Sequence, residues 1–258
     1  MGQPPSNTTG ESQYRRILGV NFFTGDASEA VEIGVRGGLV LVPAAPLLLE
    51  LERDRECRQA LLEADLVITD SGFMVLLWRL LTGERIHRVS GLEYLKLLLA
   101  RPELKEPRSV IWVMPSEASS KRNLAWLQSQ GCPVETADCH VAPKYPRGPI
   151  SDEKLIDLVN ERRPRHVIIC VGGGVQEKLG HYLKCRAAEP PAIHCIGAAI
   201  GFLSGDQVRI PMWADQWILG WLFRCAANPR RFVPRYFSAL RLAIVLWHYR
   251  SQMPDLAN

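Results

Sequence analysis

Short apolar runs alternate with longer segments of mixed polarity along the first four fifths of the chain. Most runs are rich in β-branched residues and apolar on both faces, which is typical of strands in a parallel sheet covered by helices. We expect strands at residues 16–21, 38–42, 66–70, 110–114, 134–137, 166–171 and 193–197. The segments between them predict helices at residues 27–36, 47–63, 72–81, 92–100, 116–130, 152–161 and 175–187.

This order of elements predicts an α/β fold of Rossmann-like type. Strands that alternate with helices form βαβ units with right-handed crossovers, which build a mostly parallel sheet flanked by helices. We expect this domain to cover residues 15–204, after a disordered start at residues 1–14. Residues 205–258 then form a helical, basic, membrane-associating appendage.

Charge and tryptophan gather in that appendage. A chain with 47% hydrophobic and 22% charged residues is neither disordered nor fibrous. The net charge of +4 lies entirely in residues 205–258, which hold seven Arg, no Lys and three Asp, together with four of the seven Trp. Arg combined with Trp and long aliphatic side chains suits a membrane surface, whereas nucleic-acid binders usually spread Lys and Arg over a broad face. We therefore expect a membrane partner and no nucleic acid.

Two apolar helical stripes are predicted within the appendage. Tryptophans at spacings of four form the first stripe, at Trp213, Trp217 and Trp221. A second helix begins near Pro234 and places Phe237, Leu240, Ile244 and Trp247 on one face. Its apolar segment, residues 236–249, is too short to span a bilayer but can lie in the interface. The alternative is a helix packed on the core or on a second copy of the chain.

Cysteines and targeting signals indicate a cytoplasmic protein on the inner face of the cell membrane. The seven cysteines include no CxxC pair, and a reduced compartment accounts for their scattered spacing. Residues 1–12 contain no apolar run typical of a signal peptide. Cys132, Cys139 and His140 match no zinc-binding spacing, so we expect no metal.

Four predicted strands end in residues that can carry chemistry. Parallel sheets bind ligands at the carboxyl ends of their strands. Asp70 ends one strand, where a carboxylate is held rigidly enough to act as a general base. The alternative is that Asp70 caps the helix that follows it. Residues 43–46 and 197–201 follow two other strands.

The fourth strand end is rich in glycine and suits a phosphate group. Gly172, Gly173 and Gly174 stand between a strand and a helix, where backbone N–H groups and the helix N-terminus favour an anion. Gln176 and Glu177, in the first helical turn, can reach a base or a sugar, although a tight turn with polar neighbours explains the same pattern. Arg88 and Arg209 are further candidates for a diphosphate, with surface or structural ion pairs as the alternative.

Read together, these motifs resemble one enzyme family. Their order along the chain is ADLVITDSG, RVSG, GGGVQEK, IGAAIGFLSG, RIP, WxxR (a Trp and an Arg three residues apart) and NPRR followed by RY. This order is similar to that of the WecG/TagA/CpsF family of glycosyltransferases over roughly residues 15–240. The resemblance implies transfer of an N-acetylmannosamine-type sugar from a UDP donor to a lipid-linked sugar on a polyprenyl diphosphate, in cell-surface polysaccharide synthesis. It implies an inverting reaction that needs neither a metal nor another cofactor.

The resemblance also implies roles for individual residues. Asp70 matches the family's proposed catalytic base, and Arg88 matches an arginine that precedes a motif glycine. Gln176 and Glu177 match a Gln-Glu pair near the nucleotide-sugar. Arg209 and Pro211 match the family's Arg-Ala-Pro motif. The family also has a basic appendage that reaches the membrane and helps to complete the site. The residues that match it are Arg224, Arg231, Arg235 and Tyr236. We add Trp247 to this membrane or acceptor group.

Several positions depart from the family pattern. The chain has Pro43, Ala44 and Ala45 where the family has Thr-x-Asn, Gly174 in place of a proline, Gly201 in place of an Asp and Gly220 in place of a Glu. These losses favour one alternative, a non-catalytic relative that serves as a binding or scaffold protein. A second alternative, a nucleotide-dependent oxidoreductase, has little support because position 177 is Glu and the dinucleotide fingerprint GxGxxG is incomplete.

Overall fold

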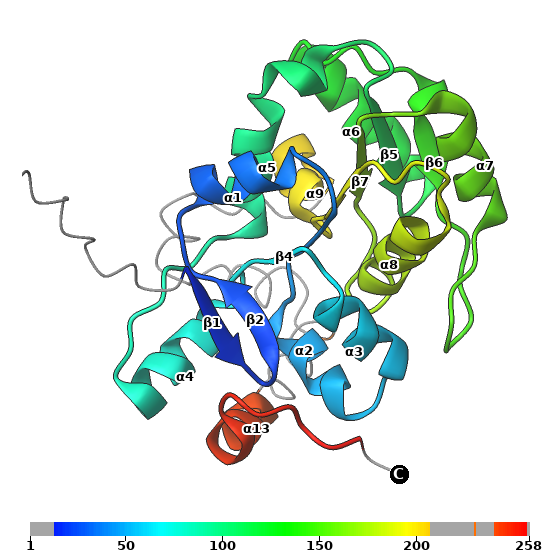
Figure 1. Ribbon diagram of the computed structural model, residues 1–258. Coiled ribbons are helices and arrows are strands. Elements are labelled where there is room, and N and C mark those ends of the chain that lie inside the picture. The colour runs from blue at the N-terminus through cyan, green and yellow to red at the C-terminus, as the bar shows by residue number, and fades with distance from the viewer. Residues whose placement is uncertain (1–12, 207–229, 231–239, 257–258) are drawn as a thin grey trace, which may run out of the picture.

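The computed structural model describes residues 13–206, 230 and 240–256. Its centre is a six-stranded, entirely parallel sheet in the order β4-β3-β8-β7-β5-β6 (Figure 1). The strands are β3 (Leu39–Leu41), β4 (Leu66–Val67), β5 (Val110–Met114), β6 (Cys139–Val141), β7 (His166–Ile169) and β8 (Ala192–Cys195). The predicted Rossmann-like α/β fold is therefore confirmed.

Helices cover both faces of the sheet. One layer contains α2 (Ala45–Leu48), the 3-10 helix η1 (Leu49–Glu52), α3 (Arg55–Leu62), α7 (Glu153–Arg162) and α8 (Gln176–Arg186). The other contains α1 (Ala27–Gly34), α5 (Gly91–Leu99), α6 (Glu117–Ser129) and α9 (Ala199–Ser204). Two further short helices are η2 (Pro102–Lys105) and η3 (Thr136–Asp138).

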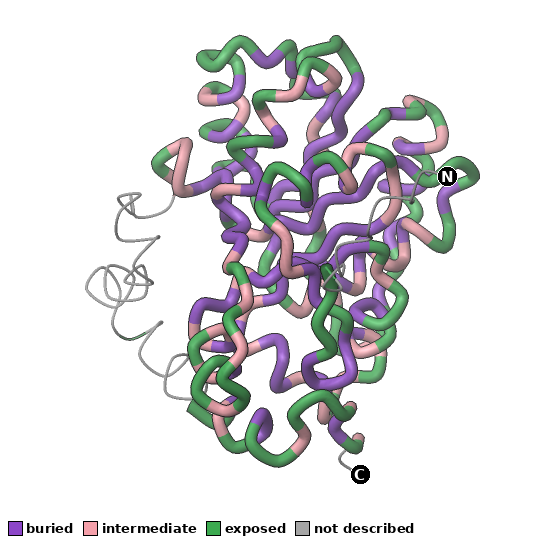
Figure 2. Tube along the Cα trace, turned by 60° about the vertical axis from the view of Figure 1, so that its left-hand side comes forward, coloured by how far each residue is buried: buried purple, intermediate pink, exposed green. Residues whose placement is uncertain are grey.

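Successive residues of a strand enter opposite cores. Leu39 and Leu41 pack with the first layer of helices, whereas Val40 between them packs with the second. This alternation follows from the two-residue period of a strand, and it explains why the strands are apolar on both faces. The buried segments run through the middle of the molecule, as the purple trace in Figure 2 shows.

Two predicted strands are wrong. Residues 16–21 do not form one strand but part of a hairpin of β1 (Tyr14–Ile17) and β2 (Val20–Phe23), paired antiparallel. Its turn residues, Leu18 and Gly19, have φ of 48° and 77°, as a two-residue hairpin turn with positive φ at both positions requires. Residues 134–137 lead into η3, whose ends are fixed by reciprocal hydrogen bonds of Glu135 and Asp138, and β6 begins only at Cys139.

The helix predicted at residues 47–63 is divided into three elements. Asp54 interrupts it, because its carboxylate accepts a hydrogen bond from the Cys57 N–H at 2.9 Å and begins α3 as an N-cap. Helix α9 was not predicted, since its residues read as the end of a strand. The other helices predicted within residues 15–204 are present with small shifts at their ends, including α4 (Gly72–Thr82). The predicted helix with Trp213, Trp217 and Trp221, and the predicted start of the second helix near Pro234, lie outside the described residues.

A buried polar chain crosses the second core. The Tyr94 hydroxyl lies 2.9 Å from His194 Nδ1, and His194 Nε2 lies 3.2 Å from His166 Nδ1. Both imidazoles are fully enclosed, and burial lowers the pKa of His166 to about 4 and that of His194 to about 3. Neutral imidazoles suit this arrangement, because each can donate from one ring nitrogen and accept at the other.

The end of the chain returns to the α/β domain. Helix α13 (Arg241–Tyr249) packs against α4, α2 and η1 through Leu242, Val245 and Leu246. The residues after it accept hydrogen bonds from the hairpin turn, with Leu18 N–H donating to the Arg250 carbonyl at 2.7 Å. Within the described residues, no helix combines the length and hydropathy needed to cross a bilayer. The division at residue 205 stays a prediction.

Candidate functional site

The predicted site residues lie along one edge of the sheet. Strands β4, β3, β8 and β7 are neighbours in a parallel sheet, so the loops at their carboxyl ends are adjacent. These loops contain Asp70, Ala44, Gly197 and the Gly172–Gly174 run. A surface depression of about 360 Å³, lined by residues such as Cys132 and Glu135, lies instead near the amino end of β5 and contains none of the predicted residues.

Asp70 is held against the start of a helix other than the one that follows it. Its Oδ1 accepts a hydrogen bond from the Gly91 N–H at 2.9 Å, and Gly91 is the first residue of α5. The positive end of the α5 dipole therefore stabilises this carboxylate. The cap of α4 is Ser71, whose hydroxyl accepts from the Met74 N–H, so the alternative that Asp70 caps α4 is wrong.

Arg88 is brought to the same strand end. Its Nε donates a hydrogen bond to the Asp70 carbonyl at 2.9 Å. The buried Thr69 hydroxyl donates to the His87 carbonyl at 2.6 Å and accepts from the Val89 N–H at 3.3 Å. These three bonds fix the loop before α5 across the end of β4, so the half-buried guanidinium of Arg88 stands beside Asp70.

Gly91 lies in close packing where three strand ends meet. A Cβ at this position would lie 3.0 Å from Val42 Cγ1, 3.7 Å from the Ile196 carbonyl and 3.9 Å from Asp70 Oδ1. Glycine thus lets α5 begin directly against the ends of β3 and β8, and its N–H reaches Asp70. The RVSG motif contains Gly91, but the motif alone does not predict the contact between the Gly91 N–H and Asp70.

Gln176 and Glu177 fasten two loops to each other. Glu177 is fully buried and accepts hydrogen bonds from the Gly174 N–H at 2.6 Å and from Gln176 Nε2 at 2.8 Å. Gln176 Oε1 accepts from the Gly197 N–H at 2.6 Å. Burial raises the pKa of the Glu177 carboxyl, against the opposing effect of these hydrogen bonds. The hydrogen bonds of these two side chains therefore join them to each other and to the loops after β7 and β8.

The glycine run has one position with a strict backbone requirement. Gly174 has a φ of +88°, in the left-handed region that favours glycine, while Gly172 and Gly173 are exposed. The Cys57 thiol donates to the Gly174 carbonyl at 3.4 Å. The sequence could not predict this contact, because the two residues are 117 positions apart and cysteine carries no signal for such a contact.

The remaining predicted residues are not brought to this edge by the described contacts. Helix α2 begins at Ala44 without a side-chain hydrogen bond to its N-terminus, where the family pattern would supply polar side chains. Trp247 lies on α13. Six residues fall outside the described part of the chain: Arg209, Pro211, Arg224, Arg231, Arg235 and Tyr236.

Comparison with known proteins gives one family and two relatives. The sequence model described as "Glycosyl transferase WecG/TagA/CpsF family" matches residues 15–255. A protein of Bacillus subtilis (strain 168) is 24% identical over 191 residues, which cover 71% of this chain and 71% of the relative. A protein of Bacillus spizizenii (strain ATCC 23059 / NRRL B-14472 / W23) is 23% identical over 235 residues, 84% of this chain and 86% of the relative. Both are named N-acetylglucosaminyldiphosphoundecaprenol N-acetyl-beta-D-mannosaminyltransferase.

Proposed function

This chain belongs to the WecG/TagA/CpsF family of glycosyltransferases, and we propose that it moves an N-acetylmannosamine-type sugar from a UDP donor to a lipid-linked acceptor. The names of the two relatives support this substrate class, because they specify that sugar and an acceptor on undecaprenyl diphosphate. The acceptor proposed here is likewise a sugar carried on a polyprenyl diphosphate. The product is a precursor of a cell-surface polysaccharide.

One observation carries the proposal most directly. Asp70 and Arg88 are placed together at the carboxyl edge of the sheet, in line with the glycine loops after β8 and β7. The edge thus combines a carboxylate, a guanidinium and a glycine-rich turn before a helix. These are the groups that a transfer from a nucleoside diphosphate sugar needs: a proton acceptor, a cation and backbone groups for phosphate.

In the proposed mechanism, Asp70 accepts the proton of the acceptor hydroxyl as that oxygen attacks the anomeric carbon. The bond from the anomeric carbon to the UDP oxygen breaks on the opposite face, so the configuration inverts. The Gly91 N–H fixes Oδ1 of Asp70 and keeps the carboxylate in one orientation. Fixed geometry of this kind lowers the barrier because the base need not be ordered during the reaction.

The charge that develops on the departing UDP is met by the protein in this proposal. Arg88 stands at the edge already, and Gly172 and Gly173 expose their backbone there. The positive end of the α8 dipole begins at Gln176. Arg209, from outside the described residues, is the further cation that we assign to the diphosphate.

The second part of the proposal places the protein on the inner face of the cell membrane. Helices α4 and α13 pack against each other (Figure 1), and both expose large apolar side chains. Leu80 on α4 is 73% exposed, and Ile244 and Trp247 on α13 are 70% and 65% exposed. The Arg250 guanidinium lies 5.9 Å from the Trp247 ring centroid. Apolar side chains beside arginine are typical of a surface that rests on anionic lipid.

Introducing negative charge on this surface tests the membrane assignment. Removing residues 206–258 would also remove the buried contacts of α13, so point substitutions are more informative than truncation. We expect the double variant Ile244→Glu, Trp247→Glu to lose sedimentation with anionic vesicles. Leu62→Glu on α3, at an exposed leucine away from α4 and α13, should retain it. Vesicle binding that is unchanged in the double variant would contradict the assignment.

A panel of UDP-sugars tests the enzymatic proposal. We expect UDP-N-acetylmannosamine to raise the melting temperature and to be consumed only when a lipid-linked acceptor is added. The transfer should continue in EDTA, because the proposed chemistry uses no metal. Stabilisation by a different UDP-sugar would replace the donor, and the absence of stabilisation and of transfer with every UDP-sugar would refute the proposal.

A further inference from the structure

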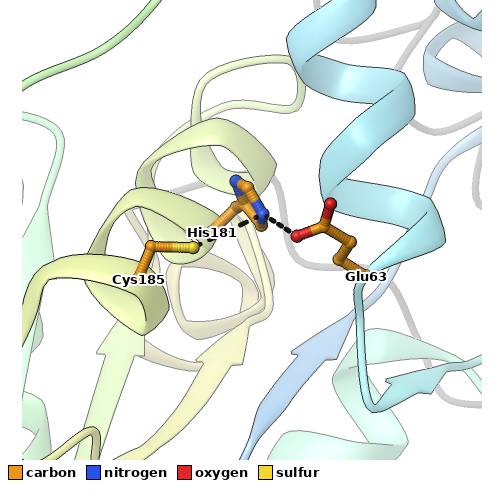
Figure 3. Close-up of side chains that lie close together, drawn as sticks. All are labelled: Glu63, His181 and Cys185. Carbon is orange, nitrogen blue, oxygen red and sulfur yellow. Dashed lines mark hydrogen bonds and ion pairs between the residues drawn. The ribbon is translucent and has the colours of Figure 1, made fainter.

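Three side chains with metal-binding atoms converge where α3 meets α8. Glu63 is the residue at the C-cap of α3, and His181 and Cys185 are one turn apart on α8 (Figure 3). His181 Nε2 lies 2.8 Å from Glu63 Oε2 and 3.6 Å from Cys185 Sγ. All three potential ligand atoms lie within 4.8 Å of one another.

We propose that Glu63, His181 and Cys185 form a zinc-binding site that joins α3 to α8. Imidazole nitrogen, thiolate sulfur and carboxylate oxygen are the three ligand types that Zn²⁺ takes in proteins. Residues four apart on a helix share one face, so His181 and Cys185 present their ligand atoms side by side. Three protein ligands leave the fourth tetrahedral position to water.

Neighbouring side chains already orient the carboxylate. Gln59, one turn before Glu63, donates from Nε2 to Glu63 Oε1 at 2.9 Å and leaves Oε2 directed at His181. Lys184 Nζ donates to the Glu63 carbonyl at 2.7 Å and fixes the backbone there. Hydrogen bonds that orient the ligating groups are a regular feature of zinc sites and contribute to their affinity.

The position is accessible to an ion and balanced in charge. The His181 side chain is only 16% exposed, while Glu63 and Cys185 are open to solvent. The Lys184 ammonium opposes a cation, but it is paired with Asp65 at 2.7 Å.

A simple ion pair between His181 and Glu63 is the competing explanation. It accounts for the 2.8 Å contact but not for the sulfur that lies against the same imidazole nitrogen. It also requires no thiol at position 185. A zinc ion would use all three groups, after the nitrogen and oxygen separate enough to admit bonds of roughly 2.0–2.3 Å.

Metal binding by the full-length chain tests the proposal. After treatment with EDTA, one equivalent of Co²⁺ should produce a thiolate-to-cobalt charge-transfer band that Zn²⁺ abolishes. At a free Zn²⁺ concentration of 100 times Kd, the melting temperature should rise by about 5–10 °C. Cys185→Ser and His181→Gln should each lower zinc affinity by at least about 10–100-fold.

Matched variants separate this site from adventitious binding. Cys139→Ser and His248→Gln change the same residue types on β6 and α13 and should keep the cobalt band and the full thermal shift. The absence of both signals in the wild-type protein, or equal zinc affinity in the wild type, Cys185→Ser and His181→Gln, would overturn the proposal. These readouts do not depend on sugar transfer.

Discussion

Substitution of Asp70 by asparagine isolates the basicity of the side chain from its structural role. Asparagine has nearly the same shape as aspartate. Its carbonyl oxygen can accept the hydrogen bond that the Gly91 N–H donates to Asp70 Oδ1, at 2.9 Å in the native protein. What disappears is the negative charge at the start of α5 and the ability to take a proton. The loss of a charge from a helix N-terminus costs about 0.3–1 kcal/mol of the free energy of unfolding, so the variant should fold normally.

The effect on the reaction should be far larger. General-base catalysis contributes about 10²–10⁴-fold to a rate, which corresponds to roughly 3–5 kcal/mol of the activation barrier. We expect kcat of Asp70→Asn to fall by that factor. The KM of the UDP donor should change little, because the proposed role of Asp70 is toward the acceptor hydroxyl.

Asp65→Asn is the matched control, since Asp65 immediately precedes β4 and Asp70 lies in the loop after it. Its carboxylate accepts hydrogen bonds from the Leu39 N–H at 2.6 Å and from Lys184 Nζ at 2.7 Å, at the amino edge of the sheet. This control should lose some stability and retain its rate. The rates of the two variants are compared as initial rates of transfer at saturating donor. Circular dichroism of both variants checks that they are folded. A well-folded Asp70→Asn that keeps wild-type kcat, or a control that is equally slow, would refute the assignment of the base.

Three further predictions concern the loops, the core and the C-terminal helix. Glu177→Ala should lower the free energy of unfolding by about 1–3 kcal/mol, because the Gly174 N–H loses its acceptor. The same variant should raise the KM of the donor. Urea unfolding and a KM that are both unchanged would contradict this prediction. The buried neutral imidazoles of His166 and His194 bind fewer protons than they do in the unfolded chain. Their contribution to the free energy of unfolding is therefore fully present above about pH 6.5 and should fall by about 2 kcal/mol per imidazole by pH 5. Urea titrations at several pH values should show a smaller pH dependence in His194→Gln. Leu246→Ala should cost about 2–5 kcal/mol by leaving a cavity under α13, whereas the exposed Leu240→Ala should be nearly neutral in thermal unfolding.

The sheet could be predicted because each strand is a short run apolar on both faces. The bounds of β5 (Val110–Met114) agree with the predicted ones, since five apolar residues stand between Ser109 and Pro115. The β1–β2 hairpin was missed because Leu18 and Gly19 lie inside a continuous run and only backbone geometry reveals the turn. Strand β6 was misplaced because Val134 reads as a strand while the local hydrogen bonds of Glu135 favour η3.

The meeting of Asp70 and the glycine run at one edge of the sheet could be predicted, but their contacts could not. Asp70 and the glycine run follow strands, and strand ends of a parallel sheet must meet at one edge. The role of Gln176 could not be inferred, because its partner Gly197 is 21 residues away and becomes its neighbour only through strand pairing. The same holds for Glu63 and His181, which are 118 residues apart.

The anchoring of α13 changes what kind of segment the basic region is. Asp206 is held by the Ser119 hydroxyl at 2.7 Å and by an ion pair with Arg122, and the residues after α13 are bonded to the β1–β2 turn. The chain is therefore attached to the body both at Asp206 and after α13. A chain attached at two points gives up part of its conformational entropy on folding. That part of the entropic cost of bringing a cation to a diphosphate therefore does not fall on the binding step.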